Sequence, residues 1–330
     1  KSTVPVGTAE HVKEIIKKNY SGEFDVASNP ETLAEGSAVK DALYPNRVIV
    51  GVDSSKAEKI LREVYSPFFF PHQSGKVHVM GIRDAELSKY AFNTYLAAQV
   101  HITNVLANIS RVAGANWRAI IPAVLGDERI GRFVHPGIGF GGSCFRKDVS
   151  ALKRTASDLG LDELTLQSLN IILKQNENQK MKLNKGIISL FGEDLSNFTI
   201  AIWGLSFKKD TNDIRDASSL IVIPDLLKRG AKIRAHDPQA GDGFVKEMQI
   251  KMVDLSNFSL INDMYETLNN SDLLFITNDW RVYRQPDFSE LRKRLKQKII
   301  FDGKDIIDYN SFLEQKDFAY YSIGRPDITK

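Results

Sequence analysis

The sequence is poor in the features that mark secreted, membrane and metal-binding proteins. It holds one cysteine in 330 residues, so no intramolecular disulfide can form, which fits a reducing, cytoplasmic compartment. No apolar run approaches the roughly 18–20 residues that span a bilayer. Its 44 Lys and Arg exceed its 41 Asp and Glu by three, too few for a field that attracts nucleic acid or an anionic membrane. The six histidines show no metal-ligand spacing, so no metal site is expected.

What the sequence does contain is a dense motif around that cysteine, Gly139–Asp148, which reads GFGGSCFRKD. Two glycines just before Cys144 let a ligand approach the backbone closely. Arg146, Lys147 and a helix that starts beside the cysteine would all favour the thiolate. Asp148 follows one helical turn later and falls on the same face. A lone cysteine is more often a buried apolar side chain, but glycines and charges at this density favour a nucleophile.

The first stretch of the chain alternates between helical and extended patterns. Helices are predicted over residues 8–18 and 54–65, and strands over 24–27, 47–52 and 77–80. Alternation of this kind predicts a mostly parallel, doubly wound sheet.

A long helix is predicted next, because residues 84–113 contain no Pro or Gly and repeat apolar residues at helical spacing. At 1.5 Å per residue it would run about 45 Å, enough to bridge two lobes and to offer a face to a second subunit. Further helices are predicted from Asn116, Val149 and Glu163 onward. A second Rossmann-like lobe follows, with strands over 199–203, 232–236, 273–277 and 299–302.

The motif around Cys144 resembles the active-site signature of the UDP-glucose/GDP-mannose dehydrogenases. The similarity continues in order and spacing through most of the chain, at Lys1–Thr8, Asn29–Glu31 with Glu35 and Gly36, Lys89 with Asn93, and Phe207–Thr211. That family oxidises the alcohol of a sugar nucleotide to the acid with two NAD molecules. The resemblance therefore implies NAD as cofactor, a UDP-sugar substrate, and a homodimer or higher homo-oligomer formed through the central helix.

One element of that family is absent from the sequence. No Gly-x-Gly-x-x-Gly follows a strand, although this fingerprint normally positions the pyrophosphate of a dinucleotide. Family members carry it upstream, and Lys1 lies inside a family motif, so we expect roughly the first hundred residues of such an enzyme to be missing.

The expected fold is α/β, with two Rossmann-like doubly wound lobes joined by a long central helix, the first lobe incomplete. Residues 1–83 are expected to be the C-terminal part of an NAD-binding Rossmann domain. Residues 84–190 are expected to form a central helical domain with the cysteine loop. Residues 191–330 are expected to form a UDP-sugar-binding domain.

The resemblance assigns catalytic roles to particular residues. Cys144 captures the aldehyde formed by the first oxidation as a thiohemiacetal, and a thioester follows the second oxidation. Lys89 and Asn93, four apart on one helix face, make a donor pair suited to an oxyanion. An ordinary exposed lysine is the alternative interpretation from the local sequence.

For the proton-transfer steps, more than one residue could act as the base. The first proton goes to water near Asp148 and Thr3, or to Lys89, and the hydrolytic water is activated by Asp148 or Glu31. From the local sequence alone, Thr3 is equally consistent with a residue that forms a turn. Glu31 and Glu35 are consistent with a solvated charged face.

The resemblance also implies two sets of binding residues. Cofactor binding is expected at Thr3, Glu35, Lys147 and Arg215. Substrate binding is expected at Glu31, Leu33, Lys89, Asn93, Arg129, Phe133, His135, Gly137, Phe140, Gly141, Phe145, Lys208 and Lys304, with Arg129 reaching the neighbouring subunit's site. Three positions depart from the family pattern: Thr32 replaces a common Phe, Asn212 a common Gly, and Lys304 an Arg, which loses a bidentate fork.

The residues beside the cysteine favour UDP-glucose among the substrates of the family. Phe140, together with Phe145 directly after the cysteine, is typical of the UDP-glucose enzymes. Enzymes that oxidise GDP-mannose tend to carry leucine after the cysteine. Enzymes that act on N-acetylated hexosamines tend to carry histidine before it. Oxidation of GDP-mannose or a UDP-N-acetylhexosamine is one alternative. The other is a non-catalytic fragment that dimerises and binds sugar nucleotide without turnover.

Overall fold

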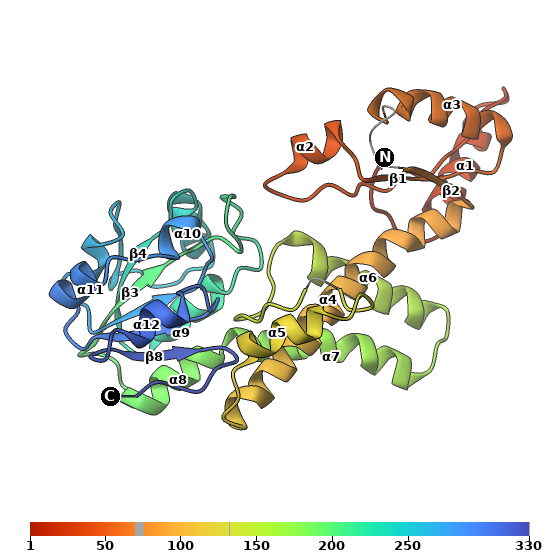
Figure 1. Cartoon of the computed structure of the whole chain (residues 1–330). Coiled ribbons are helices and arrows are strands. Elements are labelled where there is room, and N and C mark those ends of the chain that lie inside the picture. Colours follow the sequence, from red (N-terminus) through yellow and green to blue (C-terminus); the bar gives the residue numbers. More distant parts are fainter. Residues whose placement is uncertain (70–75, 132, 330) are drawn as a thin grey trace. The chain divides into compact units, whose positions relative to one another are not determined.

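The computed structural model describes residues 1–69, 76–131 and 133–329. The chain divides into two compact units (Figure 1): the first holds Lys1–Tyr95 and Lys147–Asn170, and the second holds Leu96–Arg146 and Ile171–Lys330. The long helix expected at 84–113 is confirmed as α4 (Ile82–Val112), which has 31 residues. Three helices contribute residues to both units: α4, α6 (Ser143–Asp158) and α7 (Glu163–Lys180).

The first unit contains a two-stranded parallel sheet, as the alternating pattern predicted. β1 (Arg47–Gly51) pairs with β2 (Lys76–Met80), and α3 (Ser55–Tyr65) lies between them in the chain. Ser54 caps α3, because its Oγ accepts a hydrogen bond from the Ala57 N–H at 3.1 Å. Two short elements were not expected, α2 (Ala38–Leu43) and the 3₁₀ turn η1 (Ser66–Phe68).

The predicted helix at residues 8–18 is confirmed as α1 (Thr8–Asn19). Its N-terminus is capped from far along the sequence. The buried carboxylate of Glu86 accepts hydrogen bonds from the N–H of Gly7 at 2.7 Å and of Ala9 at 2.8 Å. A negative charge at this position satisfies two amides that the helix itself leaves unpaired.

The strand expected over residues 24–27 is wrong. Beside that segment only Ser28 pairs with β1, exchanging both backbone hydrogen bonds with Gly51 at 2.9 and 2.7 Å. The next side chain, Asn29, donates to the carbonyl of Ile49 at 2.7 Å, and the proline after it has no N–H to offer. Because the Ser28–Gly51 bridge is antiparallel and β1 ends at Gly51, residues 24–27 lie opposite positions beyond the end of β1 and have no strand there to pair with.

The second unit contains a six-stranded sheet in which every neighbouring pair is parallel, in the order β5-β4-β3-β6-β7-β8. The four expected strands are confirmed as β3 (Thr199–Trp203), β4 (Lys232–His236), β6 (Leu273–Ile276) and β7 (Ile299–Asp302). The two edge strands were not expected: β5 (Phe258–Leu260) and β8 (Ala319–Ser322). The strand order steps outward in both directions from β3, so the switch point of this doubly wound sheet lies between β3 and β6.

Alternate side chains of β3 enter two separate cores. Ile200 and Ile202 pack with one set of helices, and Ala201 and Trp203 with another set. The first set (Figure 1) comprises α5 (Trp117–Leu125), α8 (Lys182–Phe191), α9 (Ser219–Lys228) and α10 (Gly241–Ile250). The second comprises η2 (Glu266–Leu268), η3 (Arg281–Tyr283), α11 (Phe288–Arg294) and α12 (Tyr309–Leu313). Both faces of the sheet are therefore covered, as a parallel sheet requires.

Candidate active site

A cleft of ≈ 450 Å³ opens at the carboxyl edge of the six-stranded sheet. The loops after β3, β6 and β7 form part of its wall, and ligands of open α/β sheets bind at this edge beside the switch point. From these loops come Phe207, Lys208, Asp279, Arg284, Lys304 and Asp305. The volume lies in the range of small-molecule sites.

A close approach at Gly204 ties two of these loops together. Gly204 has φ +106°, and a Cβ there would lie 2.2 Å from the Cβ of Asn278, so no other residue fits. Asn278 in turn donates from Nδ2 to the carbonyl of Ser206 at 2.7 Å. The loops after β3 and β6 therefore have a fixed spacing.

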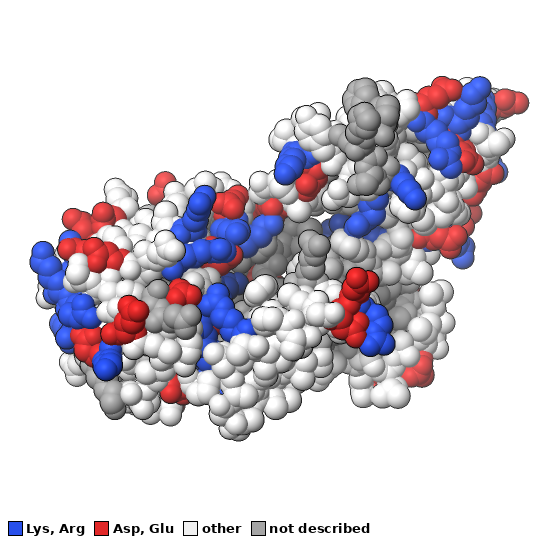
Figure 2. Space-filling view, viewed as in Figure 1, with Lys and Arg blue, Asp and Glu red and all other residues white. Residues whose placement is uncertain are grey.

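The cleft carries more positive than negative charge. Its lining includes four basic side chains, Arg118, Lys208, Arg284 and Lys304, and two carboxylates, Asp279 and Asp305. Figure 2 shows Lys and Arg side chains gathered over the C-terminal part of the second unit, with Asp and Glu between them. Burial lowers the pKa of Lys304, while Asp279 acts in the opposite direction. Partial burial, with the charges of Arg118 and Arg284, also lowers the pKa of His135. A basic lining of this kind suits a diphosphate.

The cysteine loop lines the same cleft. Helix α6 begins at Ser143, beside the cysteine as expected from the motif and ahead of the apolar pattern that starts at Val149, so Cys144 lies in its first turn and is exposed. The amides of a helix N-terminus favour an anion, which here would be the thiolate. Within this loop, the rings of Phe140 and Phe145 pack edge to face, with centroids 5.4 Å apart.

The two cations after Cys144 are paired with carboxylates. Arg146 forms an ion pair with Glu177 and lies, at Nε, 3.2 Å from Oδ1 of Asp216. The ammonium of Lys147 lies 3.5 Å from Oδ1 of Asp148. The charge of each cation is therefore balanced by a neighbouring carboxylate.

Lys89, Asn93 and Asp148 form a buried polar cluster in the first unit, with 7, 3 and 1 % of their surface exposed. Asn93 donates from Nδ2 to Oδ2 of Asp148, whereas Oδ1 is buried, has no hydrogen bond from any described residue, and lies 3.5 Å from the Lys147 ammonium. Within the part of the chain that the structure describes, Lys89 has no hydrogen-bond or ion-pair partner. Burial and then the charge of Asp148 raise the pKa of neighbouring Tyr90. Buried polar groups normally have partners, so this cluster is suited to receive another polar group.

Four more of the expected residues lie on loops of the first unit and are half-buried: Thr3, Glu31, Leu33 and Glu35. Thr3 lies in the irregular segment before α1. Glu31 accepts a hydrogen bond from the N–H of Leu33, which makes a local turn. No hydrogen bond in the described structure links Thr3, Glu31 or Leu33 to the Lys89 cluster.

Most of the expected substrate residues of the second unit do line the cleft, namely Phe133, His135, Gly137, Phe140, Gly141, Phe145, Lys208 and Lys304. Two expected arginines do not. The Arg129 side chain is 88 % exposed and pairs with Asp127, and Arg215 is 63 % exposed and pairs with Asp213 at 2.8 Å.

Sequence reasoning missed Arg118, Asp279 and Arg284 in the cleft. Asp279 and Arg284 lie in the segment that follows β6, and polar residues after the carboxyl end of a switch-point strand are a usable signal. Arg118, on α5, carries no comparable local signal.

Comparison with known proteins identifies the family. Three models of the UDP-glucose/GDP-mannose dehydrogenase family match in order: the NAD binding domain at residues 1–69, the central domain at 83–178 and the UDP binding domain at 201–309. A UDP-glucose 6-dehydrogenase of Pseudomonas aeruginosa is 39 % identical over 332 residues, covering 99 % of this chain and 72 % of that protein. The chain belongs to this family. It is an NAD-dependent sugar-nucleotide dehydrogenase.

Two further comparisons agree with the family's fold and activity. UDP-glucose 6-dehydrogenase TuaD of Bacillus subtilis is 35 % identical, over 99 % of this chain and 68 % of that protein. The structure of a UDP-glucose dehydrogenase from the archaeon Pyrobaculum islandicum matches with a TM-score of 0.84 and 29 % identity, covering 99 % of this chain and 70 % of that one. The expected family and the Rossmann-type fold with a long central helix are confirmed. The loops after β3, β6 and β7 that line the cleft lie within the matched UDP binding domain.

The described residues of the first unit do not fit the pyrophosphate of NAD at α1 or α3. The amides at the start of α1 are taken by Glu86, and Ser54 caps α3. An open helix N-terminus is what a pyrophosphate normally uses. Among the described residues, no group of three or more His, Cys, Asp or Glu converges to hold a metal ion, and no helix has the length and apolarity to cross a bilayer.

Proposed function

We propose that this dehydrogenase oxidises UDP-glucose at C6 to UDP-glucuronate through covalent intermediates on Cys144. The observation that carries the proposal is the position of Cys144, exposed in the first turn of α6, four residues before the buried Asp148, whose Oδ1 accepts no hydrogen bond from the described residues. A nucleophile and an acid–base group on one helix face are what capture and hydrolysis of an aldehyde require.

Cys144 has one task after each oxidation. The thiolate adds to the C6 aldehyde and forms a C–S bond, which gives a thiohemiacetal whose oxygen bears the negative charge. Loss of the second hydride leaves a thioester, and water then displaces the thiolate to give the carboxylate. Two NAD molecules, bound one after the other, would accept one hydride each.

Lys89 and Asn93 are proposed to stabilise the oxygen of the thiohemiacetal. Their burial and the lack of a partner for Lys89 support this role, because preorganised donors in a dry site stabilise a developing anion strongly. The Asn93 amide is held by Asp148, which fixes its orientation. Asp148, or Glu31, activates the hydrolytic water, and the first proton goes to water near Asp148 and Thr3, or to Lys89.

The cleft in the second unit is proposed as the site of the UDP moiety. Its basic lining, with Lys208 and Lys304 among the side chains, suits the diphosphate, and Phe133, Phe140 and Phe145 offer apolar surface. Further roles are proposed from the family resemblance. Cofactor contacts are proposed for Glu35, Lys147 and Arg215 in addition to Thr3. Domain boundaries are proposed near residues 83 and 190, and Arg129 is proposed to act in the site of a neighbouring subunit.

A homodimer or larger homo-oligomer formed through α4 is part of the proposal. Ile102, Leu106 and Ile109 on this helix are 50, 40 and 58 % exposed. Their spacing puts them along one side of the helix, and an apolar stripe of this kind favours burial against another surface.

The decisive experiment replaces the nucleophile. Cys144→Ser is expected to reduce steady-state UDP-glucuronate formation below about 1 % of wild type, because covalent capture is needed after the first oxidation. Binding of UDP-glucose, measured by calorimetry, should change by less than about threefold. Ser150→Ala, an exposed position on the same helix, is the matched control and should retain full activity. Turnover by Cys144→Ser above a few per cent would refute the nucleophile.

A further inference from the structure

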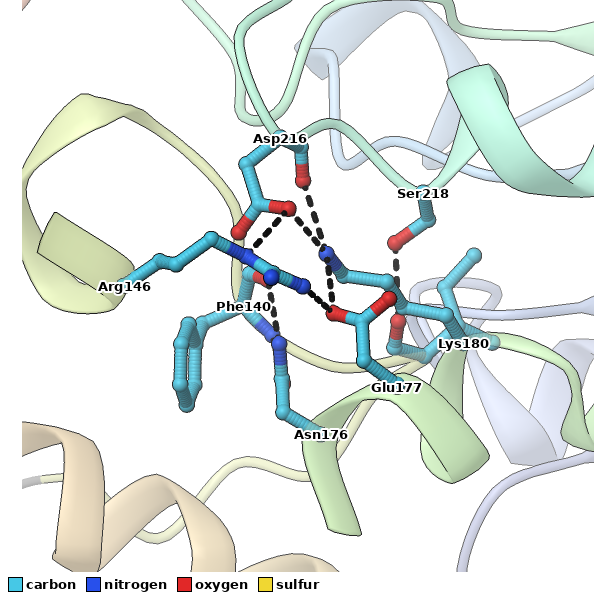
Figure 3. Close-up of polar contacts among 8 residues, drawn as sticks. Phe140, Arg146, Asn176, Glu177, Lys180, Asp216 and Ser218 are labelled. Carbon is cyan, nitrogen blue, oxygen red and sulfur yellow. Dashed lines mark hydrogen bonds and ion pairs between the residues drawn. The ribbon is translucent and has the colours of Figure 1, made fainter. Parts of the chain in front are cut away.

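The backbone of the cysteine loop is held by side chains from other parts of the second unit. Asn176 on α7 accepts a hydrogen bond from the Phe140 N–H at 2.7 Å and donates to the Phe140 carbonyl at 2.9 Å. Ser218 donates from Oγ to the carbonyl of Ile138 at 2.8 Å. Figure 3 shows these side chains reaching the loop from opposite sides. The loop is therefore positioned by residues that do not belong to the signature motif.

The glycines just before the cysteine rest on the segment that follows β3. The N–H of Gly142 donates to the carbonyl of Arg215 at 2.7 Å. A Cβ added at Gly141 would lie 2.6 Å from the carbonyl oxygen of Asp216, and one at Gly142 would lie 2.9 Å from the ring of Phe207. The same segment supplies Phe207 to the lining of the nucleotide cleft. One stretch of chain thus contacts both the cysteine loop and the cleft.

Asp216, at the centre of this contact, is fixed by Lys180. Its φ of +53° lies in the left-handed region, which a non-glycine residue keeps only when its surroundings hold it. Lys180 donates from Nζ to the backbone carbonyl of Asp216 at 3.1 Å and to its Oδ1 at 2.7 Å. The third donor goes to Glu177 at 3.1 Å. The Lys180 side chain is fully buried, and its three N–H groups have three acceptors.

Arg146 connects the same two carboxylates to the first turns of α6. Two residues after Cys144, it pairs with Glu177 and, through Nε, with Oδ1 of Asp216 at 3.2 Å. Figure 3 shows Arg146 and Lys180 approaching these carboxylates from different elements. Two cations and two carboxylates thus join α6, α7 and the segment after β3. Of these four side chains Lys180 is fully buried, so removal of Asp216, its closest partner, leaves a buried charge with less compensation.

We propose that Lys180 is a positioning residue for Cys144. Lys180 acts through Asp216, and this contact couples the nucleotide cleft to the Cys144 thiol. A nucleotide that orders the Phe207 segment also orders Asp216, and with it Gly141 and Gly142. By linkage, the same coupling makes the reactivity of the thiol depend on the nucleotide. The proposal rests on the proposed function only for the choice of UDP as the probe.

The single cysteine allows a direct test on the full 330-residue chain. The rate constant for alkylation by iodoacetamide is measured with and without saturating UDP in wild type, Lys180→Met, Lys180→Arg and Asp216→Asn. Lys174→Met, an exposed position on α7, is the matched control. UDP is expected to change the rate constant about fivefold or more in wild type and in the control. In Lys180→Met and Asp216→Asn the change should fall below about twofold, with the Kd for UDP within about threefold of wild type.

The possible results support or overturn the proposal as follows. The proposal is overturned if UDP changes the alkylation rate constant equally in wild type, Lys180→Met and Asp216→Asn. It is also overturned if UDP does not change the alkylation rate constant of the wild-type thiol. Lys180→Arg keeps the charge and should retain part of the coupling, which a loss of fold would not produce. If Lys180→Met does not fold, Asp216→Asn and Lys180→Arg decide. Failure of Cys144 as nucleophile would show in turnover by Cys144→Ser, so the two failures are distinguishable.

Discussion

The largely buried Lys89 side chain lies on α4 one helical turn before Asn93, with no carboxylate partner among the described residues. Its charge is therefore available to a ligand. Lys89→Met keeps most of the volume and removes the donor. We expect kcat for UDP-glucose oxidation to fall about 10²- to 10³-fold, because the donor acts on an oxyanion that exists only along the reaction. KM should change by less than about threefold, as steady-state kinetics will show.

Lys59→Met, at an exposed position on α3, is the control and should behave as wild type. A change confined to KM would instead make Lys89 a contact that binds substrate and transition state equally. In that case the oxyanion would need another donor, and Asn93 would be the remaining candidate.

At the scale of single residues, the sequence was informative where chemistry and spacing are local. Cys144 and Asp148 are four apart in a motif, and Lys89 and Asn93 four apart on a helix, so one-dimensional spacing was enough to pair them. Lys180 and its partner Asp216 are separated by 36 positions. Nothing in the local sequence of Lys180 distinguishes it from a surface lysine, because its burial comes from the way α7 meets the segment after β3.

At the scale of elements, the capping of α1 by Glu86 is a contact with a measurable effect on stability. Glu86→Ala leaves the N–H groups of Gly7 and Ala9 without an acceptor at a buried position. We expect the free energy of unfolding to fall by about 2–3 kcal/mol, measured by urea denaturation. Glu14→Ala, exposed on the same helix, is the control. A midpoint equal to that of wild type would mean that solvent satisfies both amides.

Element by element, the sequence predicted the strands that have several apolar residues and missed those whose identity depends on their neighbours. β3, β4, β6 and β7 were found from their patterns. β5 is a three-residue edge strand, and its pairing with β4 is not visible in its own sequence. The strand expected over 24–27 failed for a related reason: its residues are compatible with a strand, but the antiparallel Ser28–Gly51 bridge places them beyond the end of β1, where no partner strand lies.

At the scale of the whole molecule, we expect the cysteine loop and the nucleotide cleft together to determine the specificity for the sugar nucleotide. We expect kcat/KM for UDP-glucose to exceed that for GDP-mannose or UDP-N-acetylmannosamine by about tenfold or more, because Phe140 and Phe145 pack together in the cysteine loop, beside which the sugar is proposed to bind. Steady-state kinetics with the three sugar nucleotides measure this ratio. An equal or better value for either competitor would remove the assignment to UDP-glucose and leave the reaction class intact.

The pH dependence of stability depends on an ion pair buried in the second unit. Asp305 is 7 % exposed, pairs with the buried Arg325 and accepts a hydrogen bond from Ser322 at 2.9 Å. Burial raises the pKa of Asp305 to about 6, although the charge of Arg325 acts to lower it. The folded protein therefore binds a proton more tightly at this carboxyl than the unfolded chain does. The resulting stabilisation is complete below the unfolded pKa, about 4, and is lost as the pH rises through about 6.

Asp305→Asn removes this titration. Between pH 7.5 and pH 5, the free energy of unfolding of wild type should rise by about 1 kcal/mol relative to that of the variant, since protons taken up by Asp305 favour the folded state. Urea denaturation at both pH values measures the difference, and Glu314→Gln, an exposed carboxylate nearby in sequence, corrects for general charge effects. Parallel pH profiles for wild type and Asp305→Asn would mean that Asp305 stays ionised beside Arg325. The ion pair would then prevail over burial in setting the charge at this position.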